Sequence, residues 1–365
     1  MKLTNKTILL ISPEPWGHIF VSKHHYAVNL AKRDNKVFFL NPPSNNSSLK
    51  KTQFREVYTV DYKGFLPGVR FLPAFIQKRL IREQFDHLQK FCKVKFDIIW
   101  SFDNSVFFDF SALPKSLIKI SHIVDLNQNF MSARAFSTAD ICFGVTKEIV
   151  DRSIRFNQHS YFINHGYNAS HKVMGGVNLS GNNLIRCMYL GNLAMKHLDW
   201  ELIRKLVLRF KNVDFWFVGP DSEEKSMRNS THEFKEEVIA SSNVRFFPKI
   251  SSDQILEYLR MADILLIAYQ EQYHLDQSNS HKMMEYLASG KPIVASWTAE
   301  YASLSHEALI AMPVRNSEVP EKFAEVIEDL EGWNSVEKSS KRIAYALDNT
   351  YDRQLDRIED KLNML

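Results

Sequence analysis

Residues 280–296 read Ser280-His281-Lys282-Met283-Met284-Glu285-Tyr286-Leu287-Ala288-Ser289-Gly290-Lys291-Pro292-Ile293-Val294-Ala295-Ser296. The apolar side chains recur at helical spacing up to Gly290, which stands where a left-handed C-terminal cap belongs. Pro292 then prevents the helix from continuing. Residues 293–295 are a short apolar strand of the kind found in parallel sheets. The stretch therefore predicts a helix followed at once by a buried parallel strand, which is the repeating unit of an α/β fold.

Lys282 and Glu285 stand three positions apart in this predicted helix, so both side chains lie on one face near its start. Free backbone N–H groups and the positive end of the helix dipole favour an anion there, and a lysine adds positive charge. A carboxylate one turn further on suits a diol, such as the two hydroxyls of a ribose. The pair therefore predicts a nucleotide diphosphate site. A surface salt bridge on an ordinary βαβ unit would produce the same spacing.

Short apolar strands alternate with helical segments along the chain, which predicts an α/β fold with doubly wound parallel sheets. The predicted strands are 7–12, 36–40, 97–101, 118–124 and 141–145, then 186–190, 214–218, 244–247, 264–268 and 293–295. The turn-rich residues 164–183 form the best linker. We expect a Rossmann-like domain over 1–166, a second over 167–340, and a helical segment, 341–365, that packs back on the first. Ligands would bind at the carboxyl ends of both sheets, in a cleft between the domains.

The composition is that of a soluble globular protein, since 45% of the 365 residues are hydrophobic and 24% are charged. No apolar run approaches the ~18 residues of a transmembrane helix, and the first apolar run, 7–12, is too short for a signal peptide. Cys92, Cys142 and Cys187 are widely spaced, which fits a reducing cytoplasm and neither a disulfide framework nor a zinc site. We therefore expect a cytoplasmic protein, and no nucleic-acid partner.

One segment, Val69–Lys95, concentrates positive charge. It holds seven basic and two acidic residues, although the net charge of the whole chain is only +4. Apolar residues recur within it at roughly helical spacing. A basic amphipathic helix of this kind can lie on an anionic membrane surface, which would make the protein peripheral at the inner face of the cell membrane. The alternative is a helix whose apolar face packs on the core and whose basic face is solvated.

Four blocks of the second half carry a family resemblance, in the expected order. The blocks are Tyr189-Leu190-Gly191-Asn192-Leu193, Phe215-Trp216-Phe217-Val218-Gly219-Pro220, residues 243–269 and residues 282–294. Together they resemble the nucleotide-sugar domain of GT-B glycosyltransferases of the family 4/family 1 type, and most of all the bacterial polysaccharide and teichuronic-acid-type enzymes. The resemblance implies a GT-B fold and a donor site in which Lys282 meets the diphosphate and Glu285 the ribose.

The first half resembles the same family more loosely. The matching segments are Trp16-Gly17 with Lys23-His24-His25, residues 122–125 with their terminal aspartate, and the interdomain segment 163–168. One loop departs from the family pattern, because Gln277 stands eight positions before Glu285, where many retaining members carry a glutamate. The sugar-facing loop Gln270–Ser280 therefore cannot be carried over, and whether transfer retains or inverts the anomeric configuration stays open.

Transfer from a nucleotide sugar requires that the leaving diphosphate be neutralised. The chain contains no Asp-x-Asp pair to hold a divalent ion. We therefore expect a metal-free site without a cofactor, in which Lys282 and helix N-termini offset the charge. The resemblance adds Gly191 and Lys196, in the turn after the first strand of the second half. It also implies that Gly17 lets the first loop approach the diphosphate, and the alternative for Gly17 is a plain turn.

The candidates for catalysis are Asp125 and His25, both in the first half. Asp125 ends an apolar strand, where an inverting enzyme would place its general base; capping of a following helix is the alternative. His25 and its neighbour His24 lie at the start of the first predicted helix, where a histidine can hydrogen-bond the sugar or the acceptor. The alternative for both histidines is a capping or packing role.

Together with the resemblance, these residues indicate a glycosyltransferase that moves a sugar from a nucleotide-diphosphate sugar to a growing bacterial surface glycan, lipid-linked at the membrane. Two alternatives stay open: a nucleotide-sugar epimerase on the same fold, and a non-catalytic member that binds glycan or supports assembly. The nucleobase, the sugar, the acceptor and the oligomeric state do not follow from the sequence.

Overall fold

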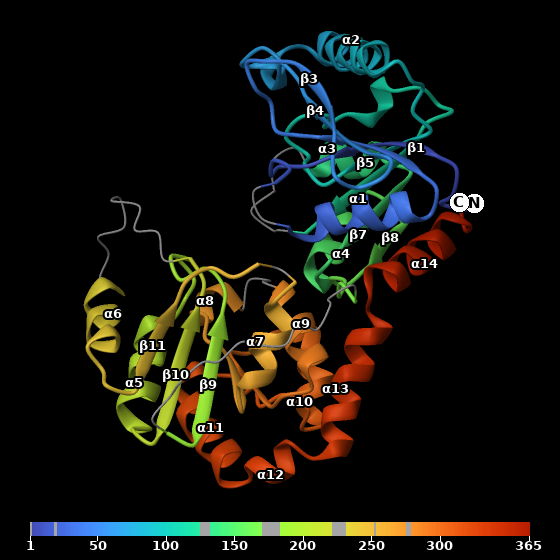
Figure 1. Cartoon of the computed structure of the whole chain (residues 1–365). Helices are drawn as coiled ribbons and strands as arrows, with labels where there is room; N and C mark the ends of the chain where they lie inside the picture. The colour runs from blue at the N-terminus through green and yellow to red at the C-terminus, as the bar shows by residue number, and fades with distance from the viewer. Residues whose placement is uncertain are drawn as a thin grey trace. The chain divides into compact units, whose positions relative to one another are not determined.

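A computed structural model describes residues 2–17, 20–124, 132–169, 183–220, 231–251, 253–274 and 279–365. The chain forms two compact units (Figure 1). Unit 1 consists of Met1–Gly166 and Tyr351–Leu365, and unit 2 of Tyr167–Thr350. The chain therefore passes from one unit to the other twice. The C-terminal segment predicted from the sequence, 341–365, is divided between the units, because its first ten residues belong to unit 2.

Unit 1 is built on one sheet with the strand order β3-β4-β2-β1-β5-β6-β7-β8. The strands are β1 (Thr7–Ile11), β2 (Lys36–Leu40), β3 (Ser48–Lys51), β4 (Val57–Asp61), β5 (Ile98–Ser101), β6 (Ile118–Ile123), β7 (Ile141–Gly144) and β8 (Ser160–Phe162). All neighbours pair in parallel except β3 and β4. The order of the strands reverses between β1 and β5, which is the switch point of a doubly wound sheet.

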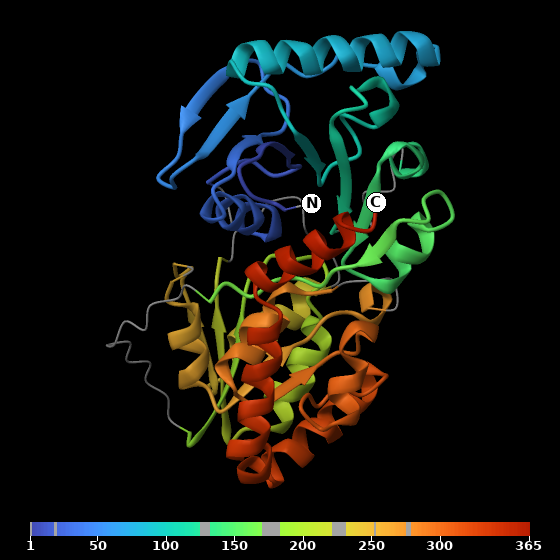
Figure 2. The same cartoon turned by 90° about the vertical axis from the view of Figure 1, so that its right-hand side faces the viewer.

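Helices cover both faces of this sheet (Figure 2). They are α1 (Ser22–Lys32), η1 (Val69–Phe71), α2 (Ala74–Cys92), η2 (Phe110–Ala112), α3 (Ser132–Thr138), α4 (Lys147–Ser153) and α14 (Tyr351–Leu362). Successive residues of β1 point to opposite faces, so Ile8 and Leu10 join one buried cluster, and Leu9 and Ile11 the other. Helix α14 is part of the first cluster, and it returns to unit 1 after the whole of unit 2 has been traversed.

Unit 2 has a smaller, fully parallel sheet with the order β11-β10-β9-β12-β13. The strands are β9 (Ile185–Leu190), β10 (Val213–Val218), β11 (Val244–Phe247), β12 (Ile264–Ile267) and β13 (Ile293–Ala295). Its order reverses between β9 and β12. Both sheets thus have the doubly wound, Rossmann-like arrangement predicted from the alternating sequence pattern, and the predicted α/β fold class is confirmed.

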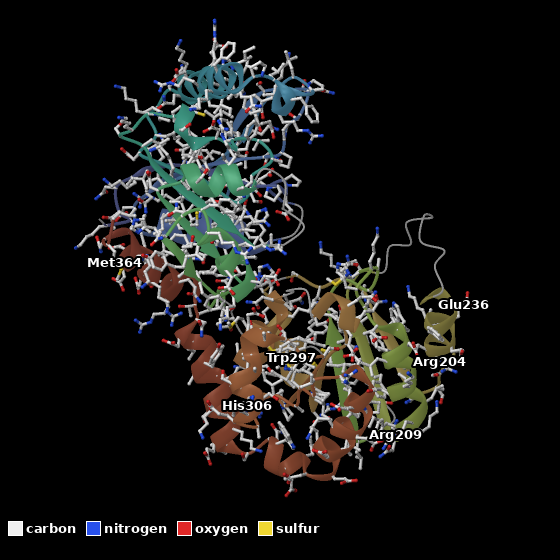
Figure 3. The ribbon with its side chains drawn as sticks, turned by 180° about the vertical axis from the view of Figure 1, so that it is seen from behind. Arg204, Arg209, Glu236, Trp297, His306 and Met364 are labelled. Atoms are coloured by element: carbon white, nitrogen blue, oxygen red, sulfur yellow. The ribbon has the colours of Figure 1, made fainter. Side chains whose placement is uncertain are left out.

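Several helices of unit 2 bury apolar residues in the core cluster that includes this sheet. The helices of unit 2 are α5 (Trp200–Arg209), α6 (Thr231–Ile239), α7 (Ile255–Met261), α8 (Glu271–His274), α9 (His281–Ser289), η3 (Ala299–Tyr301), α10 (Ala302–His306), η4 (Asn316–Glu318), α11 (Val319–Glu328), α12 (Leu330–Trp333) and α13 (Val336–Asp348). In α5, Leu206 and Val207 are buried, whereas Arg204 and Arg209 lie at the surface (Figure 3). Among the described residues, no helix is both long and apolar enough to cross a membrane.

The stretch 280–296 has the predicted structure. Helix α9 ends at Gly290, whose φ of 75° is left-handed, and β13 follows directly. A Cβ on residue 290 would lie 2.4 Å from Ser339 Oγ of α13. The fully buried Arg342 of α13 donates to the carbonyl oxygens of Gly290, Leu309 and Trp333. Because α13 closes this end of α9, the opposite end remains for a ligand.

Candidate active site

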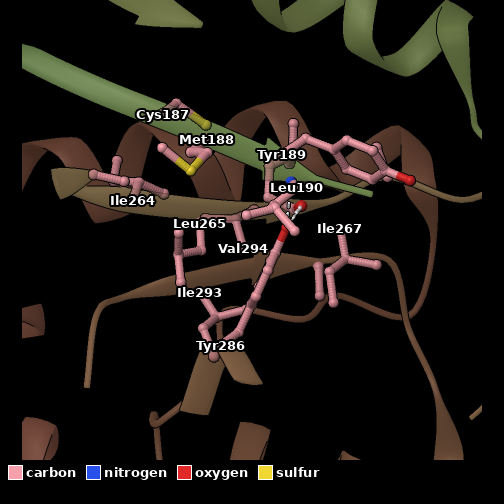
Figure 4. Close-up of a cluster of buried hydrophobic side chains, with 14 of the residues drawn as sticks. Cys187, Met188, Tyr189, Leu190, Ile264, Leu265, Ile267, Tyr286, Ile293 and Val294 are labelled. Atoms are coloured by element: carbon pink, nitrogen blue, oxygen red, sulfur yellow. Dashed lines mark hydrogen bonds between the residues drawn. The ribbon is translucent and has the colours of Figure 1, made fainter. Parts of the chain in front are cut away.

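The candidate site of unit 2 begins where β9 and β12 separate. The two strands pair only at Cys187 with Ile264 and at Met188 with Leu265. Beyond these residues the buried Tyr286 hydroxyl bridges the two strands. It accepts from the Leu190 N–H at 2.9 Å and donates to the Leu266 carbonyl at 3.3 Å (Figure 4). A side chain of α9 thus holds the carboxyl ends of the two strands apart. Doubly wound sheets bind ligands at this position.

Lys282, in the first turn of α9, lies at this separation. Its Nζ donates to the hydroxyls of Tyr189 and Tyr269, each at 2.7 Å. The ammonium also lies over both rings, 4.5 Å and 5.1 Å from their centroids. Tyr189 belongs to β9, and Tyr269 follows β12. The lysine is therefore held between the two strands of the switch point, and it remains partly exposed.

Two glycines make room for this arrangement. A Cβ on residue 191 would lie 2.1 Å from Lys282 Cε and 2.4 Å from its Nζ, so any larger residue would displace the lysine. A Cβ on residue 219 would lie 1.9 Å from the carbonyl oxygen of Gly191. The turn after β9 and the turn after β10 therefore meet backbone to backbone, and Lys282 passes directly over the first of them.

The electrostatics of the cluster keep the ammonium charged. Burial lowers the pKa of Lys282, but the two hydroxyl oxygens outweigh burial and raise this pKa above its ordinary value. Burial raises the pKa of Tyr189, which is therefore a neutral phenol. Burial also raises the pKa of Tyr269, but the neighbouring ammonium outweighs burial and leaves that pKa below its ordinary value.

Glu285 lies one turn further along α9 and is partly buried. Burial raises the pKa of its carboxyl group to about 7, and the charge of Lys282 opposes this only in part. Ser280, the N-cap of α9, makes no side-chain capping bond to the N–H groups of the first turn, although its carbonyl oxygen accepts from the Met283 N–H at 3.1 Å. The start of α9 thus offers backbone donors and a lysine to an anion, with a carboxyl group one turn away for a diol.

Lys196 is exposed on the loop between Gly191 and α5. The same loop contains Asp199, which caps α5 by accepting from the Leu202 N–H at 2.9 Å and accepts from Asn316 Nδ2 at 2.9 Å. Asp199 therefore has a structural role. Among the described residues, no group of three or more His, Cys, Asp or Glu side chains is placed to hold a metal ion.

The candidates of unit 1 lie in a different setting. Gly17 has a left-handed φ of 87°, and no atom lies within 4 Å of the position that its Cβ would take. His24 is fully buried, and its Nδ1 accepts from the Val21 N–H while its Nε2 donates to the Pro15 carbonyl. His25 stacks on Tyr351 of α14, with ring centroids 4.8 Å apart. His24 therefore serves packing and capping, whereas His25 is only partly buried and its predicted part in catalysis stays a prediction.

Three sequence predictions fall on residues that the structure does not describe. Asp125 lies in 125–131, Gln277 lies in 275–278, and the loop Gln270–Ser280 is described only in part. Conversely, the sequence interpretation missed Tyr189, Tyr269 and Tyr286, whose hydroxyls build the site. A signal for the first two exists, since each lies at the carboxyl end of a strand beside the predicted switch point.

Residues 185–331 match the protein-family model described as "Glycosyl transferases group 1". This range runs from β9 to α12 and contains Lys282, Glu285, Gly191 and all three tyrosines of the site. Unit 2 carries a group 1 glycosyltransferase domain. The prediction that the chain is a glycosyltransferase of the GT-B family 1/4 type is thereby confirmed. No curated protein matches the chain.

Solved structures share the fold of this glycosyltransferase over its full length. The sucrose-phosphate synthase of Thermosynechococcus elongatus superimposes with a TM-score of 0.69 at 12% identity, covering 98% of each chain. HepE of Anabaena, in complex with UDP and glucose, gives 0.69 at 14% identity over 99% of this chain and 100% of its own. The α,α-trehalose 6-phosphate synthase of Burkholderia multivorans gives 0.70 at 10% identity over 98% of each chain. At these identities the similarity is one of fold, and that fold is GT-B.

Proposed function

We propose that this glycosyltransferase moves a sugar from a nucleotide-diphosphate sugar to a growing bacterial surface glycan that is lipid-linked at the inner face of the membrane. One observation carries the donor part of the proposal. Lys282 is held by Tyr189 and Tyr269 at the start of α9, and Glu285 lies one turn away. The solved structures of HepE with UDP and glucose and of the E. coli trehalose-6-phosphate protein with UDP-2-fluoro glucose support a nucleotide sugar as donor.

In this proposal the diphosphate occupies the N-terminus of α9. Lys282 exchanges its tyrosine hydroxyls for phosphate oxygens, and backbone N–H groups at the start of the helix supply further donors. Glu285 accepts hydrogen bonds from the two ribose hydroxyls. As the glycosidic bond breaks, negative charge grows on the leaving diphosphate, and a preorganised cation next to it stabilises that change more than water would.

We propose that this charge compensation needs no divalent metal and no cofactor. The positive groups for it are Lys282, the start of α9 and Lys196, which is exposed on the loop after Gly191. Turnover is therefore expected to survive EDTA. Complete loss of turnover in EDTA, with recovery on adding Mn²⁺ or Mg²⁺, would contradict metal independence and leave the donor site itself in place.

A lipid-linked acceptor places the protein at a membrane surface. The basic segment Val69–Lys95 supports this part of the proposal, because several lysines and arginines near an anionic surface each contribute about 1 kcal/mol of attraction. The chain would then act in the cytoplasm as a peripheral protein, on a glycan acceptor or lipid-linked glycan presented by the inner leaflet, and it would need no nucleic-acid partner.

The central experiment measures donor binding with Lys282→Ala. A thermal-shift screen against nucleotides first identifies the base, since a ligand that binds the folded state raises the melting temperature. Calorimetry with that nucleotide sugar should then show binding weakened by about 1.5–3 kcal/mol, the range for a hydrogen bond to a charged group. Lys205→Ala is the matched control, because Lys205 pairs with Glu201 on the exposed side of α5. Equal affinity in both variants would remove Lys282 from the donor site.

Incubation with donor alone separates transfer from the epimerase alternative. A transferase leaves the nucleotide sugar intact or hydrolyses it slowly, whereas an epimerase converts it to a second nucleotide sugar. When a membrane lipid fraction is then added, transfer of labelled sugar to that fraction is the expected result. Formation of a new nucleotide sugar in the incubation without acceptor would contradict the proposal.

A further inference from the structure

Four large apolar side chains are exposed at one corner of unit 1, where η1 meets α2. Their exposed fractions are 77% for Leu66, 79% for Phe71, 40% for Leu72 and 74% for Phe75. Of the sixteen exposed large hydrophobic residues in the described chain, four fall within these ten positions. Single exposed apolar residues are ordinary, but a cluster of this size marks an interaction surface. We name residues 66–75 the aromatic corner.

The backbone of the aromatic corner is fixed by packing and hydrogen bonds. Val69 is buried beneath it, and Gly68 makes its turn with a left-handed φ of 84°. The buried Gln77 of α2 donates from Nε2 to the carbonyl oxygens of Arg70 and Leu72, at 2.9 Å and 2.8 Å. These bonds fasten η1 to the first turn of α2. The four exposed apolar side chains are therefore held in contact with water, which is unfavourable for the free energy of folding.

The rest of α2 does not offer such a surface. Ile81, Phe85 and Leu88 are buried against the core of unit 1, so the apolar face of the helix is already covered. The sequence pattern in Val69–Lys95 allowed either a membrane-facing or a core-facing helix, and along most of its length α2 faces the core. Only the aromatic corner and the basic outer face remain for a partner. In Figure 2 the outer side of α2 lies along the margin of unit 1.

The charges around the aromatic corner are positive. Arg70 and Lys78 are exposed beside it, and the Arg70 guanidinium lies 4.8 Å from the centroid of the Phe71 ring. The two acidic residues of α2 are each paired one turn away within the helix, Glu83 with Arg79 at 2.7 Å and Asp86 with Arg82 at 2.9 Å. Residues 66–78 themselves hold two basic residues and no acidic one, so this segment carries a charge of +2.

We infer that the aromatic corner inserts into the headgroup region of an anionic lipid bilayer. Phe71, Phe75 and Leu66 enter the boundary between headgroups and acyl chains, while Arg70 and Lys78 bind lipid phosphates. Exposed aromatic side chains with two exposed basic residues in the same segment match this partner, because it offers an apolar interior beneath a negative surface. The inference rests on the proposed function, which locates the protein at the membrane. It assigns membrane contact to the aromatic corner, which enters the bilayer, rather than to the whole of α2 lying flat on the surface.

The first experiment reports insertion directly. All three native cysteines are buried, so a cysteine introduced at the surface can be labelled selectively. The variant Leu66→Cys carries an environment-sensitive nitrobenzoxadiazole fluorophore, and Phe156→Cys, whose parent side chain is 51% exposed, is the control. Vesicles with 30 mol% phosphatidylglycerol should raise and blue-shift the emission at position 66 only. An unchanged spectrum at position 66, or equal changes at both positions, would overturn the inference.

The second experiment measures vesicle partitioning by co-sedimentation. Phe71→Ser and Phe75→Ser should each weaken partitioning about tenfold or more, since each removes a buried aromatic ring from the bilayer. Lys78→Glu should weaken it at low salt and less at high salt, because salt screens the charge. Phe156→Ser and Lys115→Glu are the matched controls. Partitioning of the corner variants equal to wild type would overturn the inference.

These outcomes are separable from those of the proposed function. Donor binding by calorimetry uses a soluble nucleotide sugar, and the corner variants belong to unit 1 whereas the proposed donor residues belong to unit 2. A wild-type protein that binds donor but ignores anionic vesicles overturns the aromatic corner as a membrane site and leaves the donor assignment standing. A protein that binds vesicles through the corner but binds no nucleotide sugar supports the insertion and contradicts the proposed donor.

Discussion

The two units share a doubly wound sheet but use its carboxyl edge differently. In unit 2, side chains from β9, the end of β12 and the start of α9 converge, so that Tyr189, Tyr269 and Lys282 make direct contacts. In unit 1, the aromatic residues after β1 are engaged in packing. Trp16 lies against Phe39 and His24, with centroids 5.0 Å and 5.5 Å away. In unit 2 the residues of the proposed donor site contact one another, whereas in unit 1 Trp16 and His24 serve packing and the predicted base Asp125 lies outside the described residues.

Asp125→Asn offers the largest test of this contrast. For an inverting reaction, Asp125 would supply the general base from unit 1, and its loss should lower kcat by roughly 10²–10⁴-fold while donor affinity stays the same. The matched control is Asp34→Asn, at an exposed position whose left-handed φ of 59° asparagine tolerates. If Asp125→Asn keeps most of the wild-type kcat, Asp125 is a helix-capping residue rather than a general base. Unit 1 would then contribute less to the chemistry than unit 2.

Substitution of Gly191 in unit 2 and of Gly17 in unit 1 should give the next largest effects, the first on donor affinity and the second on stability. Gly191→Ala should weaken donor binding by about 1.5–3 kcal/mol, because the added methyl group occupies the space of Lys282. Gly17→Ala meets no atom within 4 Å, so its main cost should be about 1–2 kcal/mol of folding free energy from the left-handed backbone. Calorimetry and urea unfolding of both variants measure the two terms. A large loss of donor affinity in Gly17→Ala alone would show that the loop of unit 1 reaches the diphosphate.

Glu285 predicts a pH dependence that belongs to unit 2. In the proposed site the carboxylate form of Glu285 is the one that would bind the ribose diol. Burial raises the pKa of this group to about 7, so affinity should rise by up to tenfold per pH unit below about 7 and level off above it. The ligand must be a nucleotide sugar, whose diphosphate has no terminal group titrating near neutrality. Glu285→Gln should bind more weakly at pH 8 and lose the pH dependence. A slope that persists in Glu285→Gln would assign the titration to another group.

The same pKa has an opposite consequence for stability. The pKa of Glu285 is higher in the folded protein than in the unfolded chain, so the folded state holds this proton more tightly. The contribution of Glu285 to the free energy of unfolding is therefore complete below about pH 4.5 and is lost as pH rises to about 7. Glu285→Gln stays neutral throughout. Urea unfolding without ligand should therefore find this variant more stable than wild type by about 1–2 kcal/mol at pH 8, after allowance for partial exposure, and little different at pH 4.5.

The smallest effect is expected at His25. Its ring stacks on Tyr351, so His25→Ala should cost about 1 kcal/mol of stability. Turnover of the folded protein should stay within about threefold of wild type, far from the 10²-fold loss of a general acid or base. His25→Phe, which preserves stacking without a titratable nitrogen, should restore stability. If His25→Phe is stable but almost inactive, unit 1 contributes chemistry through this histidine, and the contrast between the units fails.

The sequence was most informative where local rules decide the structure. The helix up to Gly290, the strand after Pro292 and the placing of Lys282 and Glu285 on one face all follow from spacing and backbone chemistry within one stretch. The position of Tyr189 and Tyr269 at strand ends was a usable signal, but the contacts of Tyr189 with Lys282 and of Tyr286 with Leu190 could not be predicted, because these partners are 93 and 96 positions apart in the sequence.

Two further features depend on which surfaces the core covers. His24 sits in a pattern suited to a ligand site, yet it is fully buried and bonded to Val21 and Pro15. Helical periodicity in Val69–Lys95 predicted an apolar face but not how much of it the core would use. Periodicity describes one helix, and burial is decided by its neighbours.

The late return of α14 to unit 1 determines the order in which the protein can fold during its synthesis. A nascent chain leaves the ribosome from its N-terminus. The sheet of unit 1 therefore emerges first, but Tyr351, Leu355 and Ile358, which belong to its core, emerge only after all of unit 2. Unit 2 can complete its core while unit 1 still exposes the surface that α14 will cover. The first unit to be translated is thus the last to be finished.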